Sequence, residues 1–235
     1  MSTYLWGPED HLMVPVPSVA FLMHKDDSGM CQMQRVGIPE HQIIQWSKKF
    51  GNKKKRFLDC GAHMGSYSLL LADDFKEVNA FEAQRRTYYQ LCGNIFLYEK
   101  TNVFPFHLAL TDKDHASAYA QLNVVSEDGG GSTILPTQAG QKIIRTEEVE
   151  TEYIDNFEWN DVGLLKLDVE GNELAVLVGA HETLLASNKP PIIFEANNHE
   201  WFAAKKRELF SYIISLGYTV SELRPFDNMY IAVCQ

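Results

Sequence analysis

The sequence predicts an α/β fold, in which a mostly parallel sheet carries helices on both faces. Three observations support this prediction. Short apolar runs typical of buried strands alternate with helix-like runs through most of the chain. Several strand-like runs end in polar residues, as in "RFLDC" and "LLKLD". Near the end of the chain, "YTVSEL" and "NMYIAVC" are separated by a turn and predict an antiparallel pair at the sheet edge.

The predicted elements follow an N-terminal arm. Pro8, Pro15 and Pro17 interrupt residues 1–37, so we expect an extended arm or lid there. In the core, residues 38–235, the expected elements are a helix at 40–50, a strand at 56–60, a helix at 65–72, a strand at 78–82, a helix at 85–98, a strand at 103–110, strands at 164–168 and 192–195, and a helix at 200–216.

Residues 111–150 form a polar insertion between two of these strands, with "EDGGGSTILP" at its centre. The insertion is too long for an ordinary connection, so we expect it to carry function or a short hairpin of its own. Its glycine-rich part, 128–133, is either a loop that closes over bound substrate or a plain linker, because glycine runs are flexible whatever their purpose.

Length and composition predict one domain over residues 1–235. The chain has 45% hydrophobic and 22% charged residues, close to the averages for globular proteins. Its four cysteines form no CxxC pair, which fits a reducing compartment. No basic leader precedes an apolar stretch at the start, and no apolar run reaches 18 residues. We therefore expect a cytoplasmic protein that has no membrane partner.

The formal net charge of -10 makes a nucleic-acid partner unlikely, because nucleic-acid affinity depends mainly on lysine and arginine neutralising phosphates. One basic patch exists, formed by Lys48, Lys49, Lys53, Lys54, Lys55 and Arg56. We interpret it as a solvated helix end and the loop into a strand.

The first polar strand end lies in "FLDCGAHMGSY", where Asp59 precedes a turn flanked by Gly61 and Gly65 and a helix starts near Ser66. Ligands of open α/β sheets bind at such strand ends. The pattern is DxGxxxG and not the GxGxxG of dinucleotide sites, and an acidic residue there would repel a pyrophosphate and suit a cationic ligand. Glu82 ends the next strand, about 20 residues on, where a carboxylate can bind ribose hydroxyls. S-adenosylmethionine fits this combination; the alternative is a structural turn with a capping aspartate.

These segments, with "LALTD", "LLKLDVEGNELAVLVGA" and "PPIIFEAN", resemble the FkbM-like family of S-adenosylmethionine-dependent methyltransferases over roughly residues 57–197. The resemblance implies a class I methyltransferase (Rossmann-like) fold with a seven-stranded sheet and a C-terminal antiparallel hairpin. It also implies methyl transfer to a hydroxyl oxygen, often on a sugar. The donor-site residues that it implies are Asp59, Gly61, Ala62, His63, Gly65 and Ser66 near the methionine and ribose, Glu82 at the ribose, and Ala109 and Leu110 near adenine.

Lys166, Asp168 and Glu170 occupy alternate positions of a predicted strand and should share a face beside the donor site. We expect Asp168 to orient the acceptor hydroxyl, while Lys166 or a nearby carboxylate such as Glu195 handles the proton. Asp168, Glu195 and Asn197 also supply oxygen ligands that Mg²⁺ accepts. The alternative is that Lys166 is a structural lysine neutralised by Asp59 or Asp168.

The sequence thus favours an O-methyltransferase whose partner is a sugar, glycan or small-alcohol acceptor. Two alternatives stay open: an RNA ribose 2′-O-methyltransferase, and a donor-binding module without catalysis. The glycine turn lacks the spacing of a nicotinamide oxidoreductase.

Overall fold

The structure is a computed structural model that describes residues 5–6, 13–14, 21–22, 37–38, 40–126, 130–137 and 140–234. The expected N-terminal arm lies mostly outside the described residues. Within it, β1 (Leu5–Trp6) pairs antiparallel with β2 (Met13–Val14). Residues 128–129 of the expected glycine-rich loop also lie outside the described residues.

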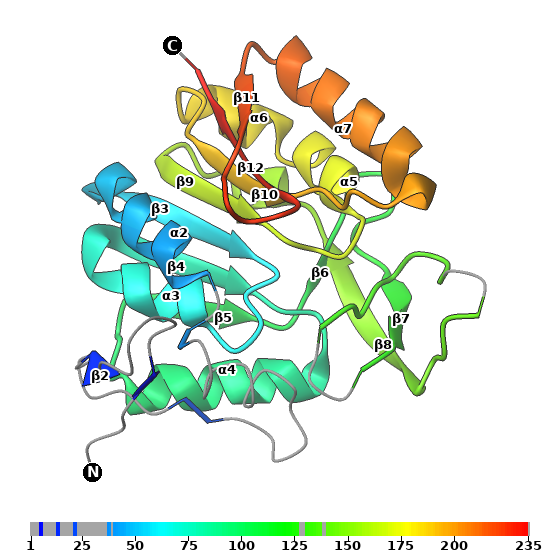
Figure 1. Cartoon of the computed structure of the whole chain (residues 1–235), viewed down its shortest axis with the longest axis horizontal. Helices are drawn as coiled ribbons and strands as arrows, with labels where there is room; N and C mark the ends of the chain where they lie inside the picture. The colour runs from blue at the N-terminus through cyan, green and yellow to red at the C-terminus, as the bar shows by residue number, and fades with distance from the viewer. Residues whose placement is uncertain are drawn as a thin grey trace.

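A seven-stranded sheet forms the centre of the molecule (Figure 1). Its strands are β3 (Asn52–Cys60), β4 (Phe75–Phe81), β5 (Val103–Phe106), β9 (Val162–Leu167), β10 (Ile192–Glu195), β11 (Thr219–Glu222) and β12 (Met229–Val233). They lie in the order β11-β12-β10-β9-β3-β4-β5. The five strands from β10 to β5 are parallel, whereas β12 is antiparallel to both of its neighbours. The predicted fold class and the C-terminal antiparallel hairpin are confirmed.

Helices cover both faces of this sheet (Figure 1). One face packs against α2 (His41–Ser47), α3 (Ser66–Leu71) and α4 (Arg85–Leu97), and the other against α5 (Glu173–Val178), α6 (His181–Ala186) and α7 (Ala203–Ser215). Short 3-10 turns are η1 (Lys48–Phe50), η2 (Ala72–Asp74), η3 (Ile154–Phe157) and η4 (Glu200–Phe202). Side chains alternate along β3, so that Phe57 joins the α2–α4 layer while Leu58 and Cys60 join the α5–α7 layer.

The insertion forms a small three-stranded sheet of its own from β6 (Ala109–Leu110), β7 (Tyr119–Val124) and β8 (Arg145–Glu152). β7 and β8 pair antiparallel across a long connection, so the insertion carries strands of its own, which is one of the two possibilities that the sequence left open. The single strand expected at 103–110 was wrong, because the chain leaves the main sheet after Phe106. Ala109 then pairs with Thr151 of β8, so the end of this segment belongs to the second sheet.

A second difference concerns the segment after β9. The strand ends at Leu167, and Glu170 lies in a turn with a left-handed φ of 54°. The prediction that Glu170 continues the strand was therefore wrong. Glycine at position 171, with φ 97°, continues this turn into α5.

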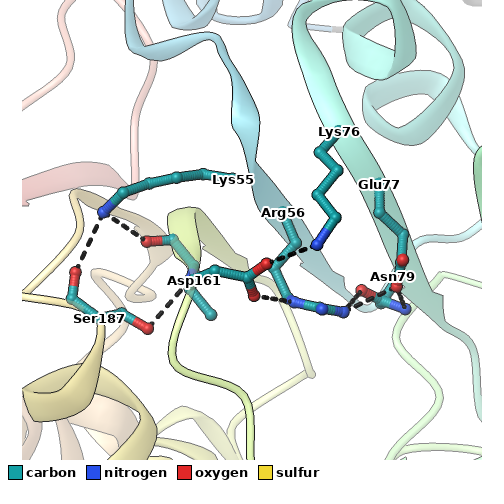
Figure 2. Close-up of polar contacts among 8 residues, drawn as sticks. Lys55, Arg56, Lys76, Glu77, Asn79, Asp161 and Ser187 are labelled. Atoms are coloured by element: carbon teal, nitrogen blue, oxygen red, sulfur yellow. Dashed lines mark hydrogen bonds and ion pairs between the residues drawn. The ribbon is translucent and has the colours of Figure 1, made fainter.

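The amino-terminal ends of β3, β4 and β9 are joined by a polar cluster centred on Arg56 (Figure 2). Its guanidinium donates hydrogen bonds to Asp161, to Glu77 at 2.7 Å and to Asn79 at 3.1 Å. Lys76 Nζ also contacts Asp161, at 3.0 Å. Arg56 is buried, and its charge is neutralised by carboxylates from two neighbouring segments, Glu77 of β4 and Asp161 before β9. This cluster lies at the end of the sheet opposite the cavities described below.

Candidate active site

A cavity of about 320 Å³ lies at the carboxyl ends of β3, β4 and β9; we call it the first cavity. Its volume is within the range of small-molecule sites. Its wall combines apolar and polar groups from the glycine turn, the end of β4, the second sheet and the turn after β9. The lining residues are Glu40, Gly61, Ala62, His63, Met64, Ser66, Tyr67, Phe81, Glu82, Ala83, Gln84, Leu108, Ala109, Leu110, Leu122, Gly130, Ser132, Ile134, Lys166, Asp168, Val169, Glu170 and Asn172.

Gly61 brings two strand ends together at the floor of this cavity. Its φ is +80°, and a Cβ atom at this position would lie 1.8 Å from the backbone oxygen of Asp168. The amide of Asp168 donates to the carbonyl of Cys60 at 3.0 Å. Only glycine fits here, because both the left-handed backbone and the close approach exclude a side chain.

Glu82 is held at the end of β4 by backbone hydrogen bonds. Its Oε2 accepts from the amide of His63 at 2.9 Å, and its Oε1 accepts from the amide of Gln84 at 2.8 Å. Burial raises the pKa of Glu82, while His63 and these two amides oppose that effect. Each carboxylate oxygen can accept a further hydrogen bond, so the pair can still receive two ligand hydroxyls.

Lys166 lies among carboxylates beside the first cavity. Its Nζ donates to the carbonyl of Gly61 at 2.8 Å and to Asp168 at 3.2 Å, and lies 3.8 Å from Asp59. Asp59 is fully buried, and its other oxygen accepts from Ser68 at 2.5 Å. Burial lowers the pKa of Lys166, but Asp168, Asp59 and Glu40 raise it more, so the lysine is an ammonium ion at neutral pH.

Glu170 separates the first cavity from a second cavity of about 240 Å³ and lines both. Its Oε1 accepts from the amide of Gly131 at 2.7 Å. Glu170 is exposed as a whole residue, but desolvation of its carboxylate in the cavity wall, followed by the charge of Asp168, raises the pKa of Glu170 to about 7. The lining of the second cavity is Gly131, Thr133, Leu135, Pro136, Thr137, Gln141, Glu170, Gly171, Glu173, Glu195, Asn197, His199, Phe202 and Lys205.

Two glutamates of the second cavity, the buried Glu173 and the half-buried Glu195, differ in their contacts. Glu173 accepts from the amides of Val169 and Gly171 at 3.2 and 3.0 Å, which fits a role at the start of α5. Burial raises the pKa of Glu173 to about 6. Burial, with Asp168, Glu170 and Glu173 adding to it, raises the pKa of Glu195 to about 9, so its neutral form prevails at pH 7.

The residues expected to bind Mg²⁺ do not form one ligand group. Asp168 lines the first cavity and pairs with Lys166, whereas Glu195 and Asn197 line the second cavity. Asn197 Oδ1 also accepts from the amide of His199 at 2.8 Å. Within the described ranges, no three His, Cys, Asp or Glu side chains are grouped to hold a metal ion. The magnesium hypothesis therefore has no structural support.

The structure brings most of the expected donor-site residues to the first cavity, namely Gly61, Ala62, His63, Ser66, Glu82, Ala109 and Leu110. Asp59 and Gly65 lie behind the wall. The residues expected to be catalytic are divided, with Lys166 and Asp168 lining the first cavity and Glu195 lining the second. The sequence analysis missed Glu40, Tyr67, Gln84, Ser132 and Asn172 as lining residues. Glu40 and Ser132 lie outside the donor-site motifs, whereas Tyr67 and Asn172 lie within quoted motifs that do not show which way their side chains point.

Fold and site together define a class I methyltransferase architecture, with a cavity at the carboxyl edge of the sheet. The chain matches the model of the methyltransferase FkbM domain over residues 59–220. Because this match covers more than half of the chain, the protein belongs to the FkbM methyltransferase family. No helix of the described part is long and apolar enough to cross a membrane.

Solved structures with this fold include methyltransferase FkbM from Methylobacillus flagellatus KT, with 18% identity, a TM-score of 0.53, and coverage of 77% of this chain and 43% of that chain. A precorrin-6y C5,15-methyltransferase from Geobacter metallireducens GS-15 has 10% identity, a TM-score of 0.52, and coverage of 92% and 93%. A precorrin 8w decarboxylase from Methanobacterium thermoautotrophicum has 14% identity, a TM-score of 0.50, and coverage of 83% and 88%. Comparison with curated protein sequences found no match. At these identities the likeness to solved structures shows the fold alone, and the chain spans less than half of the Methylobacillus protein.

Proposed function

We propose that this protein transfers a methyl group from S-adenosylmethionine to a hydroxyl oxygen, and that the acceptor is a sugar, free, nucleotide-linked or within a glycan. The observation that carries the proposal is the first cavity. At one edge of the sheet it combines a glycine turn, the buried carboxylate of Glu82, which can bind ribose hydroxyls, and a cluster in which carboxylates outnumber the single lysine, Lys166. A small alcohol is the simplest alternative acceptor.

The residues of the first cavity fit this donor. Glu82 would accept hydrogen bonds from the ribose hydroxyls, Ala109 and Leu110 would pack near adenine, and the turn from Gly61 to Ser66 would hold the amino-acid part. When bound, S-adenosylmethionine supplies an electrophilic methyl group on a sulfonium sulfur. The excess of carboxylates over cations in the wall favours a positively charged ligand.

We assign acceptor binding to the second cavity, because it shares Glu170 with the first. Its wall supplies hydrogen-bonding groups from Glu195, Asn197 and Lys205, which suit a polyhydroxylated molecule. A neutral Glu195 can donate a hydrogen bond to an acceptor oxygen. The position of Glu170 between the cavities places a carboxylate where an acceptor hydroxyl would meet the donor.

We assign the proton transfer to Glu170 and the positioning of the acceptor hydroxyl to Asp168. A base works best when its pKa lies near the working pH, and the pKa of Glu170, about 7, meets this condition. Lys166 is cationic and therefore cannot accept the proton. It holds the carboxylate of Asp168 in place instead, at 3.2 Å.

We further propose that residues 1–235 form one domain, in which residues 111–150 are an insertion.

A two-part experiment tests this function. Calorimetry should detect binding of S-adenosylhomocysteine, and a labelled-methyl screen over carbohydrates, small alcohols and RNA, with and without Mg²⁺, should label a carbohydrate. Asp168→Ala should remove turnover, whereas Asp227→Ala, at an exposed aspartate, should not. Absence of S-adenosylhomocysteine binding would refute the donor assignment, and labelling of RNA alone would refute the acceptor. Donor binding without labelling of any acceptor would favour a binding module.

A further inference from the structure

Glu40 is an acidic residue in the wall of the first cavity that precedes the segment matched by the family model. It stands directly before α2 with φ 56° and ψ 19°, a left-handed conformation that costs energy for a residue with a side chain. Its side chain makes no capping hydrogen bond to α2. Helix capping, the usual role of an acidic side chain at a helix start, therefore does not explain Glu40.

Tyr67 of α3 holds the carboxylate of Glu40 instead. The phenol Oη donates to Glu40 Oε2 at 2.6 Å, and Tyr67 is only 4% exposed. Lys166 Nζ lies 5.4 Å from the centre of the Tyr67 ring. The tyrosine thus joins Glu40 to the buried cluster of Lys166, Asp59 and Asp168, and fixes a second carboxylate beside the one of Asp168.

This cluster has too few cations for its carboxylates. Among the residues that the structure describes, Lys166 is the only lysine or arginine in the wall of the first cavity. It faces Asp168 and Asp59, and its charge also acts on Glu40. Asp59 Oδ1 is buried and has no hydrogen-bond partner in the described part of the chain. Asp59 is buried, and Glu40 and Asp168 are half-buried. Carboxylates withdrawn from water without enough positive charge are costly, so the cluster favours a cation.

We propose that Glu40, positioned by Tyr67, binds the α-ammonium group in the amino-acid tail of the methyl donor. This inference rests on the proposed function, because it assumes that S-adenosylmethionine occupies the first cavity. The ammonium group adds the positive charge that the cluster lacks and donates a charge-assisted hydrogen bond to Oε1 of Glu40, the oxygen that does not accept from Tyr67. Recognition of the amino-acid tail of the donor thus depends on Glu40, which precedes the segment that matches the family model, residues 59–220.

The test compares S-adenosylhomocysteine with its deamino analogue, in which hydrogen replaces the amino group, by calorimetric titration of the full chain. The wild-type protein should bind S-adenosylhomocysteine about 10- to 100-fold more tightly, the usual contribution of one charged hydrogen bond. Glu40→Gln should reduce this preference to about twofold or less and leave affinity for the deamino analogue nearly unchanged. Tyr67→Phe should reduce the preference in part, because the carboxylate is no longer held.

Glu158→Gln is the matched control, since Glu158 also has a left-handed φ, 54°, but is exposed and lines neither cavity. It should keep the wild-type preference. Equal binding of both ligands to the wild-type protein would overturn the inference without any variant, and an unchanged preference in Glu40→Gln would overturn it as well. In both cases the binding of S-adenosylhomocysteine would leave the proposed function intact. Failure of the wild-type protein to bind S-adenosylhomocysteine would refute both proposals.

Discussion

Lys166 illustrates how one buried side chain can combine structural and functional roles. Its position in β9 is paired with Asp59 in β3, so the ammonium group supports the register of two central strands. The same ammonium group holds Asp168, which lines the first cavity. The ion pairs with Asp59 and Asp168 favour the reading of Lys166 as a neutralised lysine over the reading in which it takes the proton.

At the same scale, Glu170→Gln should lower kcat by about 10²- to 10⁴-fold, the usual contribution of a positioned base. The base acts when deprotonated, and burial raises the pKa of Glu170 to about 7. Wild-type kcat should therefore rise with pH up to about 7 and then level off, and the variant should lack this rise. Steady-state kinetics from pH 5.5 to 9 provides the measurement.

Glu158→Gln serves as the control for this experiment and should reproduce the wild-type pH profile. Donor affinity should change little in Glu170→Gln, because the amide keeps the size of the side chain. A variant that retained the rise in kcat near pH 7 would show that another group takes the proton.

At the scale of elements, the sequence predicted most strands and helices because their signals are local. The alternation of apolar runs gave β3, β4, β9 and β10, and the turn before the last strand gave the C-terminal hairpin. The sequence could not show where the chain leaves the main sheet. Ala109 and Leu110 form a strand only by pairing with Thr151 and Glu152 of β8, about 40 residues later. Local periodicity carries no information about such a partner.

The same limit applies to the site. Residues within motifs, such as Gly61 and Glu82, line the first cavity, because the strand ends that carry them meet at one sheet edge. Glu40 reaches the cavity only through its contact with Tyr67 of α3, and Ser132 through the hydrogen bond from Gln84 at 3.3 Å. Each contact joins distant segments, so neither has a signature in the sequence.

Gly61→Ala should disrupt the junction between β3 and the segment after β9. A Cβ atom would lie 1.8 Å from the carbonyl oxygen of Asp168, and the φ of +80° disfavours a side chain. We expect loss of S-adenosylhomocysteine binding in calorimetry and a melting temperature lower by several degrees. The displaced Asp168 would also leave Lys166 without its nearest carboxylate.

Gly140→Ala is a matched control, because Gly140 also has a left-handed φ, +86°, but no atom of the described residues lies within 4 Å of a Cβ at this position. It should cost only the backbone strain, about 1 kcal/mol of unfolding free energy, and keep ligand binding. Equal losses of binding in the two variants would contradict the role assigned to the close approach at Gly61.

For the whole molecule, the buried carboxyl groups around the two cavities make stability depend on pH. Burial raises the pKa of Glu195 to about 9, whereas a glutamate in an unfolded chain has a pKa of about 4.3. Between these values the folded protein binds a proton that the unfolded chain releases. The resulting stabilisation is complete below the unfolded pKa and is lost as pH rises through the folded pKa.

We therefore expect the free energy of unfolding to fall from pH 7 to pH 9, by at most about 1.4 kcal/mol per pH unit for this group. Thermal or urea unfolding at pH 7, 8 and 9 measures the trend. Glu195→Gln should flatten it, because the amide does not titrate, and Glu158→Gln should keep the wild-type slope. A slope unaffected by Glu195→Gln would show that Glu195 is already ionised at pH 7.

The polar cluster around Arg56 also acts at this scale (Figure 2). It binds β3, β4 and the residue before β9 to one another, and none of its members lines either cavity. The residues that anchor the strands to one another and the residues that line the cavities therefore lie at opposite edges of the sheet. Substitutions that alter acceptor choice can accumulate at one rim during evolution while the other keeps the scaffold intact, so a single architecture can diversify its substrates.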